Sequence, residues 1–223
     1  KVFLHNNMDS FEKQMNVATK IKEQTGGGIL VVTEGVFGMS GDQGKLKEII
    51  EYRKSGKYNF RLFVDDAHGF GTLGNKGQGA GEAQGIQDEI DVLFGTFAKS
   101  MASIGAFVCS TDNVVNYLAY NMRSQIFAKS LPMPLVIGGL KRLELLKTSE
   151  QKVKLWNITN ALQTGLRESG FNLGISSTNI IDFVLSIYPD FNDQYIISNL
   201  QKGEYKIFQA PFGREFFKDY LID

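Results

Sequence analysis

Cysteine and histidine are scarce in this chain of 223 residues. It contains one cysteine, Cys109, and two histidines, His5 and His68. A single cysteine excludes an internal disulfide framework, and no group of cysteines and histidines has the spacing of a metal site. These absences predict a protein of a reducing, cytoplasmic compartment that holds no metal ion.

A net charge and a long apolar run are absent as well. The 24 basic side chains balance 24 acidic ones, so overall charge favours neither nucleic acid nor an anionic membrane as a partner. No stretch approaches the roughly 20 apolar residues that span a bilayer, although peripheral contact with a membrane stays open. The start, KVFLHNN, is not a signal peptide and lacks an initiator methionine, which indicates part of a longer chain.

The sequence does contain an alternation of short apolar runs and amphipathic segments. Runs such as ILVVTEG and FRLFVDDA are continuous, which is typical of strands buried on both faces of a sheet. Asp9 or Ser10 is the expected N-cap of the first helix. Strands that alternate with helices predict an α/β fold with a mostly parallel or mixed central sheet. We expect helices at 8–24, 41–56, 112–124 and within 134–170, and strands at 29–35, 60–67, 89–99 and 105–110.

The character of the chain changes near residue 150, which predicts two domains. The large α/β domain would occupy 1–150, and part of a smaller α/β domain would occupy 151–223. A long helical pattern within 134–170 crosses this boundary, and Gly170 ends it. Further along, IIDFVLSIY is expected to form a strand and QYIISNLQKG a short helix.

A G-x-G-x-x-G motif, formed by Gly69, Gly71 and Gly74, follows the second strand. In a dinucleotide-binding fold the first glycine follows the strand at once and the third lies in the helix that binds phosphate. Here four residues, 65–68, separate the strand from the glycines, and the glycine-rich NKGQGAGEAQG that follows cannot continue a helix. The motif is therefore interpreted as a loop that turns close to a ligand, not as a dinucleotide fingerprint.

Polar side chains end two neighbouring strands. Asp65 and His68 follow the second strand, and Thr96 and Lys99 end the third. Ligands of α/β sheets bind beyond the carboxyl ends of the strands. A carboxylate and an amine in one crevice suit pyridoxal phosphate (PLP), because a lysine binds its aldehyde and an aspartate keeps its pyridine nitrogen protonated. Asp66 points to the opposite face of the strand and is expected to be structural.

Three segments resemble consecutive signature blocks of one family, the α-oxoamine synthases. These are VTEGVFGMSGD, FVDDAHGFGTLGNKGQG and DVLFGTFAKSMASIGAFV, in the family's order and spacing. Within the family, SMASIGAF and the upstream FLHNNM most resemble bacterial serine palmitoyltransferase. The resemblance implies a fold-type-I PLP-dependent transferase, with helices on both faces of a mostly parallel sheet and a homodimer that shares its active sites.

The resemblance also implies roles for individual residues. Lys99 would bind the PLP aldehyde and then remove a proton from the substrate, and Asp65 would pair with the pyridinium nitrogen. His68 would donate a hydrogen bond to the phenolate oxygen of PLP. Thr96 would bind the phosphate, and Ser130, in the block FAKSLPM, would reach the phosphate of the neighbouring subunit's cofactor.

This chain departs from the family pattern at several positions. Gly38, Ala98 and Ala128 stand where the family usually has a hydroxyl, and each lost hydrogen bond would weaken cofactor binding by about 0.5–1.5 kcal/mol. The family's phosphate loop, the histidine that stacks on the pyridine ring and the arginine that binds the substrate carboxylate are not in this sequence. His5 and Arg214 do not match the contexts of that histidine and arginine.

The activity implied by the resemblance is decarboxylative condensation of an amino acid with an acyl-CoA. The expected substrates are L-serine and palmitoyl-CoA, and the expected product is the sphingolipid precursor 3-ketodihydrosphingosine. Several alternatives stay open, and one is a plain structural α/β domain that binds no cofactor. The chain could be a glycine C-acetyltransferase, an 8-amino-7-oxononanoate synthase, or a non-catalytic partner subunit, although the last normally lacks the lysine that is retained here as Lys99.

Overall fold

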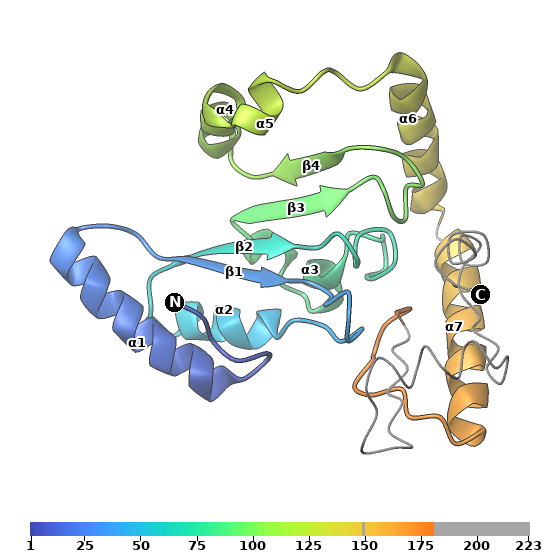
Figure 1. Cartoon of the computed structure of the whole chain (residues 1–223), viewed down its shortest axis with the longest axis horizontal. Coiled ribbons are helices and arrows are strands. Elements are labelled where there is room, and N and C mark those ends of the chain that lie inside the picture. The colour runs from blue at the N-terminus through green and yellow to red at the C-terminus, as the bar shows by residue number, and fades with distance from the viewer. Residues whose placement is uncertain (149, 181–223) are drawn as a thin grey trace, which may run out of the picture. The chain divides into compact units, whose positions relative to one another are not determined.

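A computed structural model describes residues 1–148 and 150–180 of the chain. The described residues fall in one compact unit, Lys1–Asp182. The predicted division at residue 150 stays a prediction, and the strand and helix expected beyond residue 180 lie outside the described residues. Figure 1 shows the elements of this unit. They are α1 (Met8–Thr25), β1 (Leu30–Glu34), α2 (Leu46–Lys54), β2 (Arg61–Asp65), α3 (Ala80–Ala83), η1 (Gln87–Glu89), β3 (Val92–Thr96), β4 (Ala106–Cys109), α4 (Asp112–Asn121), α5 (Arg123–Ile126), α6 (Met133–Lys147) and α7 (Glu150–Glu168).

The sheet contains the four predicted strands in their sequence order, β1-β2-β3-β4. The pairs β1–β2 and β2–β3 are parallel, whereas β3 and β4 are antiparallel. The turn that connects β3 to β4 contains Lys99. Helices lie on both sides of the sheet, as the fold-type-I prediction requires. The carboxyl ends of β1, β2 and β3 therefore meet at one edge, where ligands of such sheets bind.

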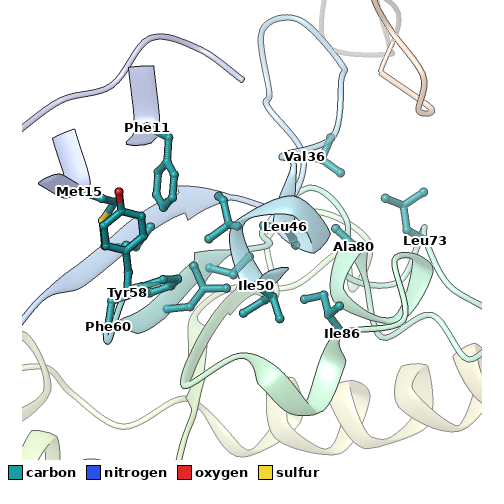
Figure 2. Close-up of a cluster of buried hydrophobic side chains, with 14 residues drawn as sticks. Phe11, Met15, Val36, Leu46, Ile50, Tyr58, Phe60, Leu73, Ala80 and Ile86 are labelled. Atoms are coloured by element: carbon teal, nitrogen blue, oxygen red, sulfur yellow. The ribbon is translucent and has the colours of Figure 1, made fainter. Parts of the chain in front are cut away.

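The core lies on one face of the sheet, between the strands and the first helices. Figure 2 shows this cluster, in which Phe11 and Met15 of α1 and Leu46 and Ile50 of α2 pack together with side chains from the strands and the loops. Val31, Leu62 and Val64 supply the strand side chains of the core. Because successive strand residues point to opposite faces, each strand contributes alternate positions to this core.

The expectation that β1 is buried on both faces is wrong for the described chain. Val31 is 5% exposed, but its neighbours Leu30 and Val32 are 56% and 57% exposed. A continuous apolar run does not reveal which neighbours cover each face, because that depends on tertiary packing. β2 alternates in the same sense, with Leu62 and Val64 buried and Arg61 exposed.

The first helix begins at Met8, where it was predicted to begin, but its N-cap differs from the predicted one. Asn7, and neither Asp9 nor Ser10, is the N-cap, and its Oδ1 accepts a hydrogen bond of 2.8 Å from the Ser10 N–H. The long helical pattern after residue 133 divides into α6 and α7. After α7, Gly170 adopts a left-handed φ of +84° and its N–H donates to the Arg167 carbonyl, so this pattern ends at the predicted glycine.

Candidate active site

The acid and the histidine of the predicted site follow β2 in a tight turn. Asp65 is the last residue of β2, and its Oδ1 accepts a hydrogen bond of 3.1 Å from the Ala67 N–H. His68 lies one residue further along the same turn. Both side chains are half-buried. The backbone of the turn therefore orients the carboxylate, while part of each side chain stays open to a ligand.

The pairing register places further polar groups on the face of the sheet that carries Asp65. Glu34 on β1 and Phe94 on β3 are the register partners of Asp65. Partners in register point to the same face, and so does Thr96, two residues after Phe94. The side chains of Glu34, Asp65 and Thr96 thus project from the same face of the sheet, at its carboxyl edge.

Lys99 lies in the turn that joins β3 to β4. Its carbonyl accepts a hydrogen bond of 2.9 Å from the Ala102 N–H, and the Ser103 N–H donates to the Phe97 carbonyl at 2.8 Å. The side chain of Lys99 is exposed. Its charge nevertheless acts on the His68 imidazole, as does that of Asp65. The charges of Asp65 and Lys99 thus both act on His68, and these three residues are called the cluster below, while the roles given to them above stay predictions.

The environment of His68 favours its neutral form. Burial lowers the pKa of the imidazole, and the positive charge of Lys99 lowers it further, against the opposing effect of Glu34 and Asp65. A neutral imidazole has one N–H that donates and one nitrogen that accepts a hydrogen bond. His68 can therefore donate to a ligand oxygen at neutral pH without carrying a charge.

Asp66 is buried beside the site, as a structural residue should be. It is 1% exposed, and its Oδ2 accepts a hydrogen bond of 2.7 Å from the Ala80 N–H. Burial raises the pKa of Asp66 to about 6, and the Asp65 charge adds to this effect while the Ala80 N–H opposes it. This hydrogen bond joins the turn after β2 to the start of α3, 14 residues later.

The glycines of the G-x-G-x-x-G motif serve turns and close packing. Gly71 and Gly74 both have a φ of +79°, a conformation that L side chains rarely adopt. A Cβ on Gly69 would lie 2.2 Å from Oδ1 of Asp66, so only glycine fits there. The helix that follows is the single turn of α3, which is too short for the phosphate-binding helix of a dinucleotide fold.

The two residues predicted to bind phosphate lie in different surroundings. The Thr96 hydroxyl donates to the Gly105 carbonyl and accepts from the Ala98 N–H, both at 3.1 Å, so its proton would have to turn away to reach a phosphate. Ser130 is exposed in the segment between α5 and α6. Its neighbour Leu131 packs against Gly105, which places this segment near the Lys99 turn.

Sequence reasoning missed contributors to the site that come from distant parts of the chain. One is Glu34, and the only local signal for it is its place at the end of a strand beside Gly35. From α7, the Trp156 indole N–H donates to the Thr72 carbonyl at 2.8 Å, and the Lys152 ammonium donates to the Gly74 and Asn75 carbonyls. No local pattern predicts that α7 would hold the glycine-rich loop.

A family model described as aminotransferase class I and II matches residues 5–193. The chain belongs to this family. Cysteate-C-fatty acyltransferase of Capnocytophaga ochracea is 63% identical over 177 residues, which make up 79% of this chain and 42% of that protein. Serine palmitoyltransferase of Bacteroides thetaiotaomicron is 34% identical over 180 residues, 80% of this chain and 44% of that protein. A solved structure described as SPT with PLP internal aldimine has a TM-score of 0.71 and 34% identity, and covers 80% of this chain and 43% of its own.

These likenesses confirm the family resemblance and the fold-type-I PLP transferase fold. The chain spans less than half the length of each of these relatives. Its identity with the cysteate enzyme is also nearly twice its identity with serine palmitoyltransferase. None of the helices in residues 1–148 and 150–180 combines the length and the apolar character that crossing a membrane requires.

Proposed function

We propose that this chain forms part of a PLP-dependent acyltransferase, which joins an amino acid to an acyl-CoA and releases carbon dioxide and CoA. The observation that carries this proposal is that Asp65 ends β2 and His68 follows it, Lys99 follows the neighbouring β3, and the charges of Asp65 and Lys99 act on the His68 imidazole. Their charges and hydrogen-bonding groups fit the cofactor, because a pyridine ring with an aldehyde and a phenolate needs an acid, an amine and a neutral donor.

Each residue of the cluster has a distinct task in the proposed enzyme. Bound PLP supplies an electron sink for the carbanion that forms at the substrate α-carbon. The Lys99 amine would hold the aldehyde carbon of PLP, and as a free amine it would take the α-proton of the substrate. The Asp65 carboxylate keeps the ring nitrogen protonated, since an anion beside that nitrogen favours its charged form. His68 donates its N–H to the phenolate oxygen.

For the amino acid, we propose cysteate ahead of the L-serine expected from sequence. The supporting observation is the 63% identity with cysteate-C-fatty acyltransferase, against 34% with serine palmitoyltransferase. Both amino acids carry a polar group on a single CH₂. Palmitoyl-CoA is retained as the acyl donor, and the product would be an α-amino ketone that keeps the sulfonate of cysteate. Serine remains the second candidate because a solved serine palmitoyltransferase shares the fold, with a TM-score of 0.71 and 34% identity.

The first experiment tests the cofactor. The purified chain is titrated with PLP, and an absorbance band of lysine-bound PLP is expected that Lys99→Ala abolishes. Lys20→Ala, which removes an exposed lysine of α1, should leave the band intact. Retention of the band in Lys99→Ala, or its absence from the wild-type chain, would contradict the proposal.

The second experiment tests the substrate. CoA release from palmitoyl-CoA is measured with cysteate and with serine, and the proposal expects at least a tenfold higher kcat/KM for cysteate. A preference for serine would restore the sequence-based expectation. In both cases Lys99→Ala is expected to reduce the rate by at least about a thousandfold, because it removes the covalent attachment and the base together.

We also propose that the enzyme is a cytoplasmic homodimer in which Thr96 binds the phosphate of its own cofactor and Ser130 that of the partner subunit. The dimer and the shared site rest on the family resemblance, and the contact of Leu131, next to Ser130, with Gly105 supports only the place of Ser130 near the Lys99 turn. Ser130→Ala should weaken PLP binding severalfold. Sedimentation should give a dimer, and a monomer that binds PLP normally would contradict a shared site.

A further inference from the structure

Glu34 lies beside the candidate site but has no task in the chemistry proposed above. It ends β1 and is the register partner of Asp65 at the end of β2. The two carboxylate side chains therefore project from the same face of the sheet, at its carboxyl edge. Glu34 is half-buried, in contrast to Leu30 and Val32 on the same strand face, which are more than half exposed.

Glu34 and His68 both contact Gly38, a residue of the loop after β1. The Gly38 N–H donates to Oε2 of Glu34 at 3.4 Å. A Cβ on Gly38 would lie 2.4 Å from Nε2 of His68, so the imidazole occupies the space that a side chain at position 38 would fill. Because Gly38 has no side chain, the His68 imidazole can lie against the Gly38 backbone. The Glu34 carboxylate accepts a hydrogen bond from the N–H of that same residue.

Three charges act on the His68 imidazole from three parts of the fold. They are Glu34 on β1, Asp65 on β2 and Lys99 in the turn after β3. The carboxylates favour the protonated ring, whereas Lys99 favours the neutral ring. Removing one carboxylate would therefore shift the balance toward the effect of Lys99.

We propose that Glu34 is a positioning residue for His68. It holds the Gly38 backbone against the imidazole and supplies a negative charge that opposes Lys99. What His68 then does for a cofactor rests on the proposed function, but the contact itself does not. The inference concerns residues of this chain only, so it can be tested without cofactor or substrate.

The test is an NMR titration of the histidine rings in the purified chain. Only His5 and His68 contribute signals, and a His5→Gln variant assigns them. Glu34→Gln keeps an acceptor for the Gly38 N–H but removes the charge, so it should lower the His68 pKa below that of the wild type. Glu34→Ala removes the acceptor as well and should also speed hydrogen exchange at the Gly38 amide. Glu34→Asp should restore the pKa in part.

Glu48→Gln is the matched control, because Glu48 is an exposed glutamate of α2. It should leave the His68 titration unchanged. The same His68 pKa in the wild type, Glu34→Gln and Glu48→Gln chains would overturn the proposal. A shift confined to Glu34→Gln supports it.

A second variant separates this proposal from the proposed function. Gly38→Ala keeps the Glu34 charge but forces the imidazole to move, so it should change the His68 ring shifts and weaken PLP binding severalfold. Unchanged ring shifts in Gly38→Ala would contradict the contact. A chain that shows the Glu34→Gln shift but never binds PLP would refute the proposed function and leave the positioning of His68 supported.

Discussion

The turn after β2 and the turn after β3 both carry residues of the candidate site, but the fold holds them differently. In the first turn, Asp66 is 1% exposed and its carboxylate accepts a hydrogen bond from the Ala80 N–H. The Trp156 indole of α7 donates a hydrogen bond to the Thr72 carbonyl. In the second turn, residues 97–105, Lys99 is exposed. The Thr96 hydroxyl and a few backbone hydrogen bonds close this second turn.

This difference matches what the proposed chemistry asks of each group. Asp65 and His68 must keep a fixed orientation toward a cofactor, and groups on buried, cross-linked backbone are held most precisely. Lys99 must bind the cofactor and then release it to the substrate, which requires a side chain that can move. The backbone of the second turn is anchored by Met101, which is 2% exposed, whereas the Lys99 side chain itself is exposed. The contrast thus separates the groups that orient the cofactor from the group that exchanges with substrate.

The largest expected effect is on the rigid turn. In Gly79→Ala, the new Cβ would lie 1.8 Å from Oδ2 of Asp66, at a backbone φ of +109°. Strain and overpacking together should lower the free energy of unfolding by about 3–5 kcal/mol. Gly85→Ala is the control, because Gly85 has a φ of +70° but no atom within 4 Å of its Cβ. Denaturant unfolding of both variants would measure the difference, and equal losses would mean that Asp66 does not make this turn rigid.

The next effect depends on pH. Because burial raises the pKa of Asp66 to about 6, the folded state holds the proton more tightly than the unfolded state. The unfolding free energy should therefore fall by on the order of 3 kcal/mol as pH rises from about 4 to above 6. Asp66→Asn lacks the titrating carboxyl group. The unfolding free energy of this variant should therefore rise relative to that of the wild type as the pH increases over the same range. The exposed Asp88→Asn variant controls for the loss of one charge, and parallel curves for all three proteins would contradict the assignment.

The sequence predicted the parts of this architecture that local pattern determines. All four strands lie where apolar runs ended in polar residues, and Asp65, His68 and Lys99 follow from strand ends. The open face of β1 and the contact between Gly38 and His68 depend on packing between segments far apart in the chain. The same holds for Glu34, which faces the site only because of its register with Asp65, 31 positions later in the sequence. Local periodicity carries no information on register or on which neighbour covers a strand.

A smaller effect is expected in the second turn. Thr96→Val removes both hydrogen bonds of the Thr96 hydroxyl, which should lower the unfolding free energy by about 1–2 kcal/mol. Hydrogen exchange at the Ala98 amide should quicken, because that N–H loses its acceptor. Thr111→Val at the start of α4 is the control, since the Thr111 side chain makes no capping bond. No change in Ala98 exchange would show that other contacts hold the Lys99 turn.

The smallest effect concerns Ala102, which follows Lys99 by three residues. Ala102 has a left-handed φ of +42°, which raises the energy of an L residue by about 1 kcal/mol. Ala102→Gly would relieve this strain but would add about as much conformational entropy to the unfolded chain, so the unfolding free energy should change by less than about 0.5 kcal/mol. The same substitution makes the folded turn easier to deform, and PLP should therefore exchange faster from Lys99 in a stopped-flow measurement. If exchange stayed unchanged while stability rose, the strain at Ala102 would have no part in the exchange of PLP from Lys99.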